Sequence, residues 1–201
     1  MSLIKSDDEI IFVSGNFDKQ QDANDVIGSR FKLRLENIDL KEIQGNESDV
    51  AWEKCYLALC QFPKNIVVIE DTSLKFDEFN GLPGPYIKHF NKAIGADGLY
   101  RMLHCYENKN ATVISTVAIG IPRNFSENGH QQILLVNDEI KGKIVSPKGK
   151  NGDYNGWDPC FQPNDTNLTL GEMSTKEKKK YCSRIHALEK ALKIIKNFLK
   201  K

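Results

Sequence analysis

Long apolar runs are absent from this chain of 201 residues. The longest, such as residues 10–13 and 66–69, fall far short of the ~18 consecutive apolar residues that cross a bilayer. Residues 1–8 also lack the apolar stretch of a secretory signal peptide. We therefore expect a soluble, cytoplasmic protein with no membrane partner.

An excess of charge of one sign is absent as well. The 28 Lys and Arg residues stand against 27 Asp and Glu residues, which leaves a net charge of +1. Proteins that bind nucleic acid usually carry a basic excess on one surface. The balance of charge therefore argues against a nucleic acid partner.

Metal-binding and disulfide patterns are missing too. The five cysteines are an odd number and form no C-x-x-C pair, and the four histidines lie far apart in the sequence. These absences argue against zinc and iron–sulfur sites. We expect the cysteines to be reduced thiols, as is usual in the cytosol.

What the sequence does contain is the composition of an ordinary folded domain, 40% hydrophobic and 27% charged. A chain of this length buries a core without disulfides or metal, so residues 1–201 are expected to form one domain. Apolar runs and helical spacings predict strands at 10–13, 66–69, 112–119, 131–136 and 140–145, and helices at 17–30, 50–62, 86–94 and 98–106. Ser174 and Glu177 form a capping box that predicts one long last helix reaching Leu199. Early alternation of strands and helices, followed by a strand-rich half, predicts an α/β fold with a mixed central sheet flanked by helices.

The segment from Ser14 to Lys19 lies between a predicted strand and a predicted helix. Gly15 is expected to allow a tight turn there, and the helix start offers free N–H groups and a positive dipole end to a phosphate. Ser14 and Asn16 add polar side chains, and Lys19 lies about one helical turn further on. The alternative is that Asn16 is only an N-cap and that Lys19 is solvated.

Two adjacent carboxylates, Glu70 and Asp71, follow an apolar strand directly. Neighbouring side chains of a strand point to opposite sides, so one carboxylate can enter a site while the other is held from behind. Carboxylates suit Mg²⁺, which prefers oxygen ligands, and Glu42 in a predicted loop is a candidate second ligand. The alternative is that both residues cap a turn with Thr72 and Ser73.

Cationic side chains that could complete a triphosphate site are spread along the chain. The candidates are Lys19, Lys54, Lys88, Lys178 and Arg184. Each alone is an ordinary surface residue, and their value as ligands depends on convergence in the fold.

A set of motifs, in this order along the chain, resembles the Ham1 family of inosine triphosphate pyrophosphatases. The motifs are Ser14-Gly-Asn-x-x-Lys19, Glu42-Ile-Gln-Gly45, Glu70-Asp-Thr72, Gly81-Leu-Pro-Gly-Pro-Tyr-Ile-Lys88, Gly156-Trp-Asp-Pro-Cys-Phe-Gln-Pro163 and Glu172-Met-x-x-x-Glu-Lys178, and the resemblance runs from about Ile10 to Leu192. It implies an elongated, two-lobed fold of the Ham1 or Maf type with the active site in a cleft between lobes. It also implies a homodimer that cleaves the small-molecule substrates ITP, dITP and XTP to the monophosphate and pyrophosphate, with Mg²⁺ as cofactor and Mn²⁺ as a substitute.

The resemblance also implies a role for each matching residue. Lys19, Glu42 and Asp71 are implied as catalytic, with Glu42 and Asp71 as metal ligands, Glu70 as a further candidate ligand and Asp71 as proton acceptor for the attacking water. Ser14, Gly15, Asn16 and Lys19 are implied to hold the triphosphate, with Lys54, Asp71, Thr72 and Lys88 as further substrate contacts. Asn155, Gly156, Trp157 and Asp158 are implied to line the base pocket, and Lys178, Ser183 and Arg184 to close it.

Three positions depart from the family pattern. Asn155 replaces a phenylalanine that stacks on the base, Ser183 replaces a histidine, and His186 replaces an arginine. We expect the ring of Tyr154 to supply the stacking that Asn155 lacks. The departures concern base recognition, whereas the phosphate and metal positions are intact.

Two other functions fit parts of the pattern. One is a related house-cleaning pyrophosphatase that acts on other modified nucleotides, and the other is a catalytically silent nucleotide-binding module. A silent module has no need of metal ligands, so the joint presence of Lys19, Glu42, Glu70 and Asp71 argues against it. The sequence favours the non-canonical purine pyrophosphatase.

Overall fold

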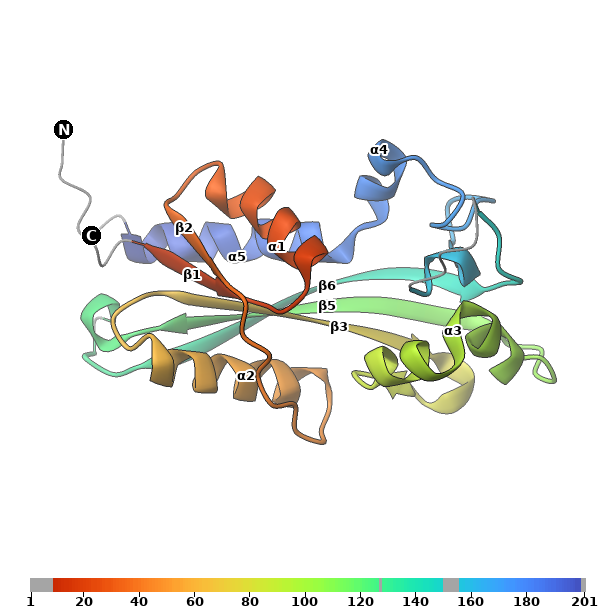
Figure 1. Cartoon of the computed structure of the whole chain (residues 1–201), viewed down its shortest axis with the longest axis horizontal. Helices are drawn as coiled ribbons and strands as arrows, with labels where there is room; N and C mark the ends of the chain where they lie inside the picture. The colour runs from red at the N-terminus through yellow and green to blue at the C-terminus, as the bar shows by residue number, and fades with distance from the viewer. Residues whose placement is uncertain (1–8, 127, 150–155, 200–201) are drawn as a thin grey trace. The chain divides into compact units, whose positions relative to one another are not determined.

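A mixed seven-stranded sheet organises the chain (Figure 1). The structure, a computed structural model, describes residues 9–126, 128–149 and 156–199. The strands are β1 Ile10–Val13, β2 Leu33–Glu36, β3 Val67–Phe76, β4 Pro83–Gly84, β5 Asn110–Ile121, β6 Gln132–Ile144 and β7 Phe161–Pro163. They lie in the order β2-β1-β3-β5-β6-β7, with β4 paired to β3. β1 is parallel to β2 and to β3, whereas β4 and β7 pair antiparallel to β3 and β6. The predicted α/β fold with a mixed sheet is confirmed.

The helices are α1 Phe17–Ala23, continued by the π-helical turn η2 Asn24–Gly28, α2 Glu47–Gln61, α3 Ile87–Met102, α4 Thr175–Lys178 and α5 Ser183–Leu199. Short 3-10 turns lie at η3 Asp77–Phe79, η4 Arg123–Phe125, η5 Asp158–Cys160 and η6 Lys179–Tyr181. Within the described ranges, no helix combines the length and the apolar character that a bilayer crossing requires.

Two compact units divide the contacts of the chain. The first comprises Met1–Asp71, Ser115–Asp138 and Arg184–Lys201, and the second comprises Thr72–Ile114 and Glu139–Ser183. Strands β3, β5 and β6 each contribute residues to both units.

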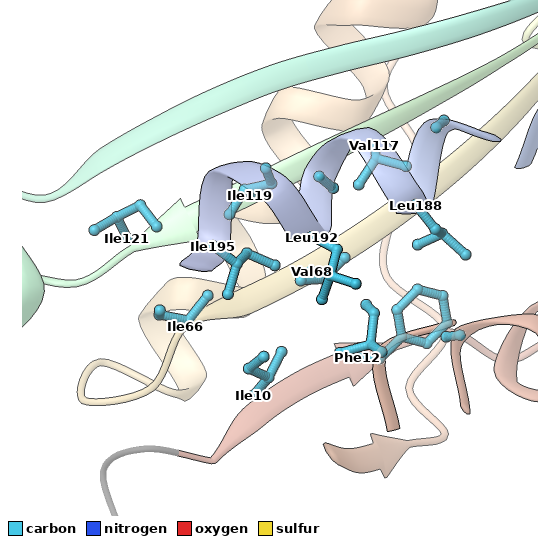
Figure 2. Packing of buried hydrophobic residues seen from close by; sticks show 14 residues of the cluster. Ile10, Phe12, Ile66, Val68, Val117, Ile119, Ile121, Leu188, Leu192 and Ile195 are labelled. Carbon is cyan, nitrogen blue, oxygen red and sulfur yellow. The ribbon is translucent and has the colours of Figure 1, made fainter. Parts of the chain in front are cut away.

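In the first unit, side chains of the sheet alternate between two apolar cores. Ile10 and Phe12 of β1, together with Ile66 and Val68, pack in one cluster with residues of α1, η2 and α5. Figure 2 shows Leu188, Leu192 and Ile195 of α5 over these strand residues. Ile11 and Val13 of β1, with Val67 and Ile69 of β3, pack in a second cluster with Ala51, Cys55, Ala58 and Leu59 of α2. In β1 and in the first-unit part of β3, the period of two therefore assigns even-numbered residues to the α1 and α5 face and odd-numbered residues to the α2 face.

The second unit has its own core around α3. Leu74 and Phe76 of β3 and Ala111 of β5 are buried there with Leu99 of α3. Gly95 interrupts α3 with a φ of 62°, a left-handed conformation that favours glycine. The prediction of two short helical patterns in this region is therefore confirmed, because α3 consists of two helical segments that meet at this glycine.

The strand predictions need several corrections, and the short strands β4 and β7 were not predicted. Residues 131–136 and 140–145 form one strand, β6, because the polar pair Asn137-Asp138 continues the extended backbone instead of turning it. β3 does not end at Glu70-Asp71 but continues to Phe76. β2 was missed, although Leu33 and Leu35 alternate with charged residues as a strand pattern does.

The last helix is also shorter than predicted. The capping box of Ser174 and Glu177 exists, but it begins the four-residue helix α4. Cys182 adopts an extended conformation, with φ −100° and ψ 92°, and α5 begins only at Ser183. Lys178 and Arg184 therefore belong to different helices.

Leu192 tests the packing of α5, because it is only 1% exposed in the core of the first unit. Leu192→Ala removes buried methyl groups and leaves a cavity, so the free energy of unfolding should fall by about 2–5 kcal/mol. Urea denaturation followed by circular dichroism measures the change. The control Lys193→Ala, at the adjacent exposed position, should remain within about 0.5 kcal/mol of wild type. Equal losses for both variants would contradict this packing of α5.

Candidate active site

Five charged side chains of the first unit form one cluster, called here the charge cluster. Its members are Lys19 of α1, Lys54 of α2, Glu70 and Asp71 of β3, and Glu42 of the segment between β2 and α2. Glu70 and Asp71 are 2% and 6% exposed. Carboxylates so deeply buried require cationic partners, and each has a different lysine.

The alternation of β3 assigns these lysines. Glu70 has the parity of Ile66 and Val68, which face α1, and Asp71 has the parity of Val67 and Ile69, which face α2. Consistent with this, Glu70 binds a lysine of α1 and Asp71 binds a lysine of α2. The two carboxylates thus point to opposite sides of β3 and bind different lysines; that one of them enters a site stays a prediction.

Lys19 is the partner of Glu70. Its Nζ lies 2.9 Å from the Glu70 Oε2 and donates to the Glu70 carbonyl oxygen at 3.2 Å. Asn16 caps α1 by accepting a hydrogen bond from the Lys19 backbone N–H, at 3.1 Å, and the Asn16 N–H donates to the Ser14 Oγ. The capping role of Asn16 is thus confirmed, whereas the alternative of a solvated Lys19 is wrong, because this side chain is only 16% exposed.

Lys54 is shared by two carboxylates. Its Nζ donates to the Asp71 Oδ1 at 2.9 Å and to the Glu42 Oε1 at 3.1 Å. Lys54 lies three residues after Ala51 and four before Ala58, which places it on the side of α2 that packs on the sheet. The start of α2 is held by a capping box between Asn46 and Asp49.

The pKa values of Asp71 and Lys54 are both raised. Burial raises the pKa of Asp71, and the ammonium groups of Lys19 and Lys54 oppose the rise without cancelling it. Burial by itself lowers the pKa of Lys54, but the carboxylates of Asp71 and Glu42 outweigh it and the net direction is upward. Lys54 therefore remains an ammonium at neutral pH, and Asp71 is a stronger proton acceptor than an exposed aspartate.

One alternative at this site is wrong. Glu70 and Asp71 do not cap a turn with Thr72 and Ser73, because all four residues lie inside β3. The chain does bend at Gly15, between β1 and α1, as predicted. This bend needs no left-handed backbone, and a Cβ at Gly15 would meet only an ordinary contact, with the Asn37 Oδ1 at 3.5 Å.

In the second unit, Asp158 and Lys178 form an ion pair that joins η5 to α4. Trp157 is half-buried against the core of that unit, and its carbonyl oxygen accepts from the Cys160 N–H. Gly156 meets the Asn91 side chain of α3, whose amide donates to the Gly156 carbonyl at 3.2 Å and accepts from its N–H at 3.3 Å when oriented to satisfy both. Sequence reasoning missed Asn91, although its helix was predicted.

The remaining predicted residues are dispersed. Lys88 lies on the exposed side of α3, Thr72 is half-buried in β3, and Ser183 is buried at the start of α5. Asn155 and Tyr154 lie outside the described residues.

Arg184 has a partner that sequence reasoning missed. Its Nε and Nη2 both lie close to the Asp22 Oδ2, at 2.7 and 2.6 Å. Asp22 lies three residues after Lys19, so α1 carries both a cluster lysine and the anchor of Arg184. The two partners are 162 residues apart in the sequence, and no local signal could have joined them.

His186 likewise has an acidic partner. Its Nδ1 lies 3.0 Å from Asp138 Oδ2, and Lys190 Nζ lies 2.6 Å from Asp138 Oδ1. Together these contacts pair α5 with β6 at a position where the resemblance implies an arginine.

The five cysteines are free thiols, as predicted. Burial raises the pKa of Cys55 and of Cys160 to about 12. Both therefore remain protonated at neutral pH and are poor nucleophiles.

The carboxylate oxygens of the charge cluster decide which metal ion it could hold. Among the described residues, no group of three or more His, Cys, Asp or Glu side chains is arranged to hold a metal ion. Two carboxylates, Glu42 and Asp71, do converge on one cation. Mg²⁺ is typically held by one or two carboxylates together with waters and substrate phosphates, so these two residues fit it.

Comparisons with known proteins agree on one family. The family model described as "Ham1 family" matches residues 10–194. An inosine triphosphate pyrophosphatase of Schizosaccharomyces pombe is 38% identical over 183 residues, which cover 91% of this chain and 90% of that protein.

Solved structures agree on the fold. A Ham1 protein of Coxiella burnetii matches with a TM-score of 0.77 at 20% identity, over 94% of this chain and 98% of that one. The Staphylococcus aureus Ham1 protein matches with a TM-score of 0.75 at 18% identity, over the same shares. A nucleoside-triphosphatase described as a dITP/XTP pyrophosphatase from Mycobacterium abscessus matches with a TM-score of 0.68 at 22% identity, over 93% and 98%.

The Arg184–Asp22 pair should stabilise the fold, because its side chains are only 21% and 19% exposed. A double-mutant cycle with alanine at both positions should give a coupling energy of about 1 kcal/mol or more in unfolding experiments. The Arg101–Asp97 pair of α3 is a matched control, since its side chains are 74% and 61% exposed, and its coupling should stay below about 0.5 kcal/mol. Coupling energies of equal size would show that the Asp22 contact does not anchor Arg184.

Proposed function

Because the chain belongs to the Ham1 family, we propose that it is a pyrophosphatase of non-canonical purine nucleoside triphosphates. The proposed substrates are ITP, dITP and XTP, and the products are the nucleoside monophosphate and pyrophosphate. The similarity to an inosine triphosphate pyrophosphatase over nine-tenths of both chains supports this reaction. The single observation that carries the proposal is the charge cluster, in which Lys54 binds both the buried Asp71 and Glu42, beside Lys19.

The first unit is proposed to hold the triphosphate. Phosphoryl chemistry needs charge neutralisation and an aligned water more than covalent help from the protein. Ser14, Gly15, Asn16 and Lys19 match the phosphate segment of the family, and the ammonium groups of Lys19 and Lys54 would offset part of the substrate charge. Asp71 would accept the proton of the attacking water, and its raised pKa suits that role.

Glu42 and Asp71 are the residues proposed to hold Mg²⁺, for which Mn²⁺ would substitute. The bound ion supplies charge neutralisation at the phosphate oxygens. Glu70 is a weaker candidate, because its Oε2 already lies 2.9 Å from the Lys19 ammonium.

Base recognition is proposed on the family match. Gly156, Trp157 and Asp158 are proposed to contact the base, with Asp158 oriented by Lys178. Arg184, oriented by Asp22, is proposed as a donor to the base. Hypoxanthine and xanthine present an acceptor at position six, whereas adenine presents a donor. A site built to donate to that oxygen leaves its donors unpaired when adenine enters.

Thr72, Lys88, Asn155 and Ser183 remain proposed substrate contacts on the family match alone. The family match also supports a homodimer. A cytoplasmic location is proposed on the five free thiols, which are typical of a reducing compartment.

Pyrophosphate release from ITP, XTP, dUTP and ATP in the presence of Mg²⁺ tests the proposed function. The value of kcat/KM for ITP and XTP should exceed that for ATP by about 100-fold or more, because a mismatched donor at position six leaves buried groups unpaired. Removal of divalent cations with EDTA should abolish release, and added Mn²⁺ should restore it. Preferred cleavage of dUTP would point to a pyrimidine enzyme, and no cleavage of any nucleotide would point to a silent binding module.

Asp71→Asn tests the proton acceptor. The amide keeps the shape of the side chain but loses its charge and basicity, so kcat for ITP should fall by about 100-fold or more. Asp77→Asn, at an exposed position of η3, is the matched control and should keep kcat within about twofold, as surface changes usually do. Circular dichroism of both variants checks the fold. If Asp71→Asn retained more than a tenth of the wild-type kcat, Asp71 would have no role in the chemistry.

A further inference from the structure

The ammonium group of Lys54 lies where a divalent metal ion bound to Glu42 and Asp71 would also have to lie. Its Nζ lies within hydrogen-bond distance of Glu42 Oε1 and of Asp71 Oδ1. The three side chains come from α2, from the segment before it and from β3, and they are 14%, 23% and 8% exposed. Three separate parts of the chain thus converge on one ammonium nitrogen.

Charge within the cluster explains why a cation is held there. The three carboxylates and two ammonium groups of the cluster leave one net negative charge, and Lys19 is engaged with Glu70. Without Lys54, Glu42 and Asp71 would lose the cation that they share in a largely buried place, which is unfavourable. Lys54 is therefore a counter-ion built into the fold.

The ammonium and a divalent cation would need the same two carboxylates. The ammonium holds their oxygens at 2.9 and 3.1 Å, whereas Mg²⁺ binds oxygen at about 2.0–2.1 Å. Two cations on the same oxygens repel each other strongly in a partly buried site. A lysine ammonium is a point charge on a flexible four-carbon stem, so it can leave the carboxylates and contact another anion.

We propose that Lys54 is a resident cation that competes with the divalent metal for Glu42 and Asp71, so that metal entry requires Lys54 to leave. The inference rests on the proposed function only in taking these two residues as the metal site. The exchange keeps the carboxylates neutralised in the absence of metal, and it releases the Lys54 ammonium for the substrate phosphates when the metal enters. Lys54 is thus a positioning residue that sets the affinity for the metal.

Binding of Mn²⁺ to the nucleotide-free protein tests the exchange without any catalytic readout. Electron paramagnetic resonance of free Mn²⁺ gives the Kd directly. Lys54→Met keeps the length of the side chain but removes its charge, so Mn²⁺ should bind about tenfold tighter or better than to wild type. Lys54→Gln serves as a second neutral variant, and Lys54→Arg should keep the wild-type affinity.

Lys19→Met is the matched control, because it removes a neighbouring ammonium that pairs with Glu70 instead of Glu42 and Asp71. Its Kd for Mn²⁺ should improve less than that of Lys54→Met, since Lys19 acts on Asp71 only through its charge, whereas Lys54 donates to both Asp71 and Glu42. An equal gain in Lys19→Met and Lys54→Met would overturn the exchange, because general electrostatics would then explain both.

Thermal unfolding adds a readout in the same proteins. In EDTA, Lys54→Met should melt at a lower temperature than wild type, because its carboxylates lose their counter-ion. Saturating Mn²⁺ should raise its melting temperature more than that of wild type. An unchanged or weaker Kd in Lys54→Met, or no Mn²⁺ binding to it at all, would overturn the proposal.

These outcomes are separate from those that test the reaction. Tighter Mn²⁺ binding in Lys54→Met, in a protein that cleaves no triphosphate, would support the exchange and reject the proposed function. Cleavage of ITP by the wild type, together with an unchanged Kd for Mn²⁺ in Lys54→Met, would support the proposed function and reject the exchange.

Discussion

Burial of two consecutive carboxylates in β3 is the constraint on which the first unit depends. Glu70 and Asp71 are nearly inaccessible to solvent, and an unpaired carboxylate in such a place would be protonated or would destabilise the fold. Because consecutive strand residues point to opposite faces, the two need counter-ions from two different helices. Lys19 of α1 and Lys54 of α2 supply them, so the scaffold and the charge cluster cannot vary independently.

The packing of the helices on the sheet determines where the ammonium groups of Lys19 and Lys54 lie. Lys19 follows the capped start of α1. Lys54 lies among the α2 residues that pack on the face of the sheet formed by the odd-numbered residues of β1 and β3. Asp22 extends the same logic, since it joins α1 to the first turn of α5 through Arg184. One short helix thereby connects a residue proposed for the phosphate with a residue proposed for the base.

Periodicity and capping signals predicted β1, α2, the start of β3 and the kinked α3, because those signals are local. They failed where polar residues continue a strand, as at Asn137-Asp138 of β6, and where an apolar stripe continues across a break, as at Cys182. Lys19, Lys54, Glu42 and Asp71 were candidates from the sequence and do lie in one cluster, but spacing could not say which lysine meets which carboxylate. Partners such as Asp22 and Asn91 left no signal, because a contact between distant segments exists only after the chain has folded.

Cleavage of a purine triphosphate to the monophosphate and pyrophosphate is the reaction proposed for the charge cluster. Phosphorus-31 magnetic resonance of a reaction with ITP and Mg²⁺ distinguishes this cleavage from others, because every phosphate product has its own signal. Inosine monophosphate and pyrophosphate should form in equal amounts, with no inosine diphosphate at any time. Formation of inosine diphosphate and orthophosphate would rule out the proposed reaction.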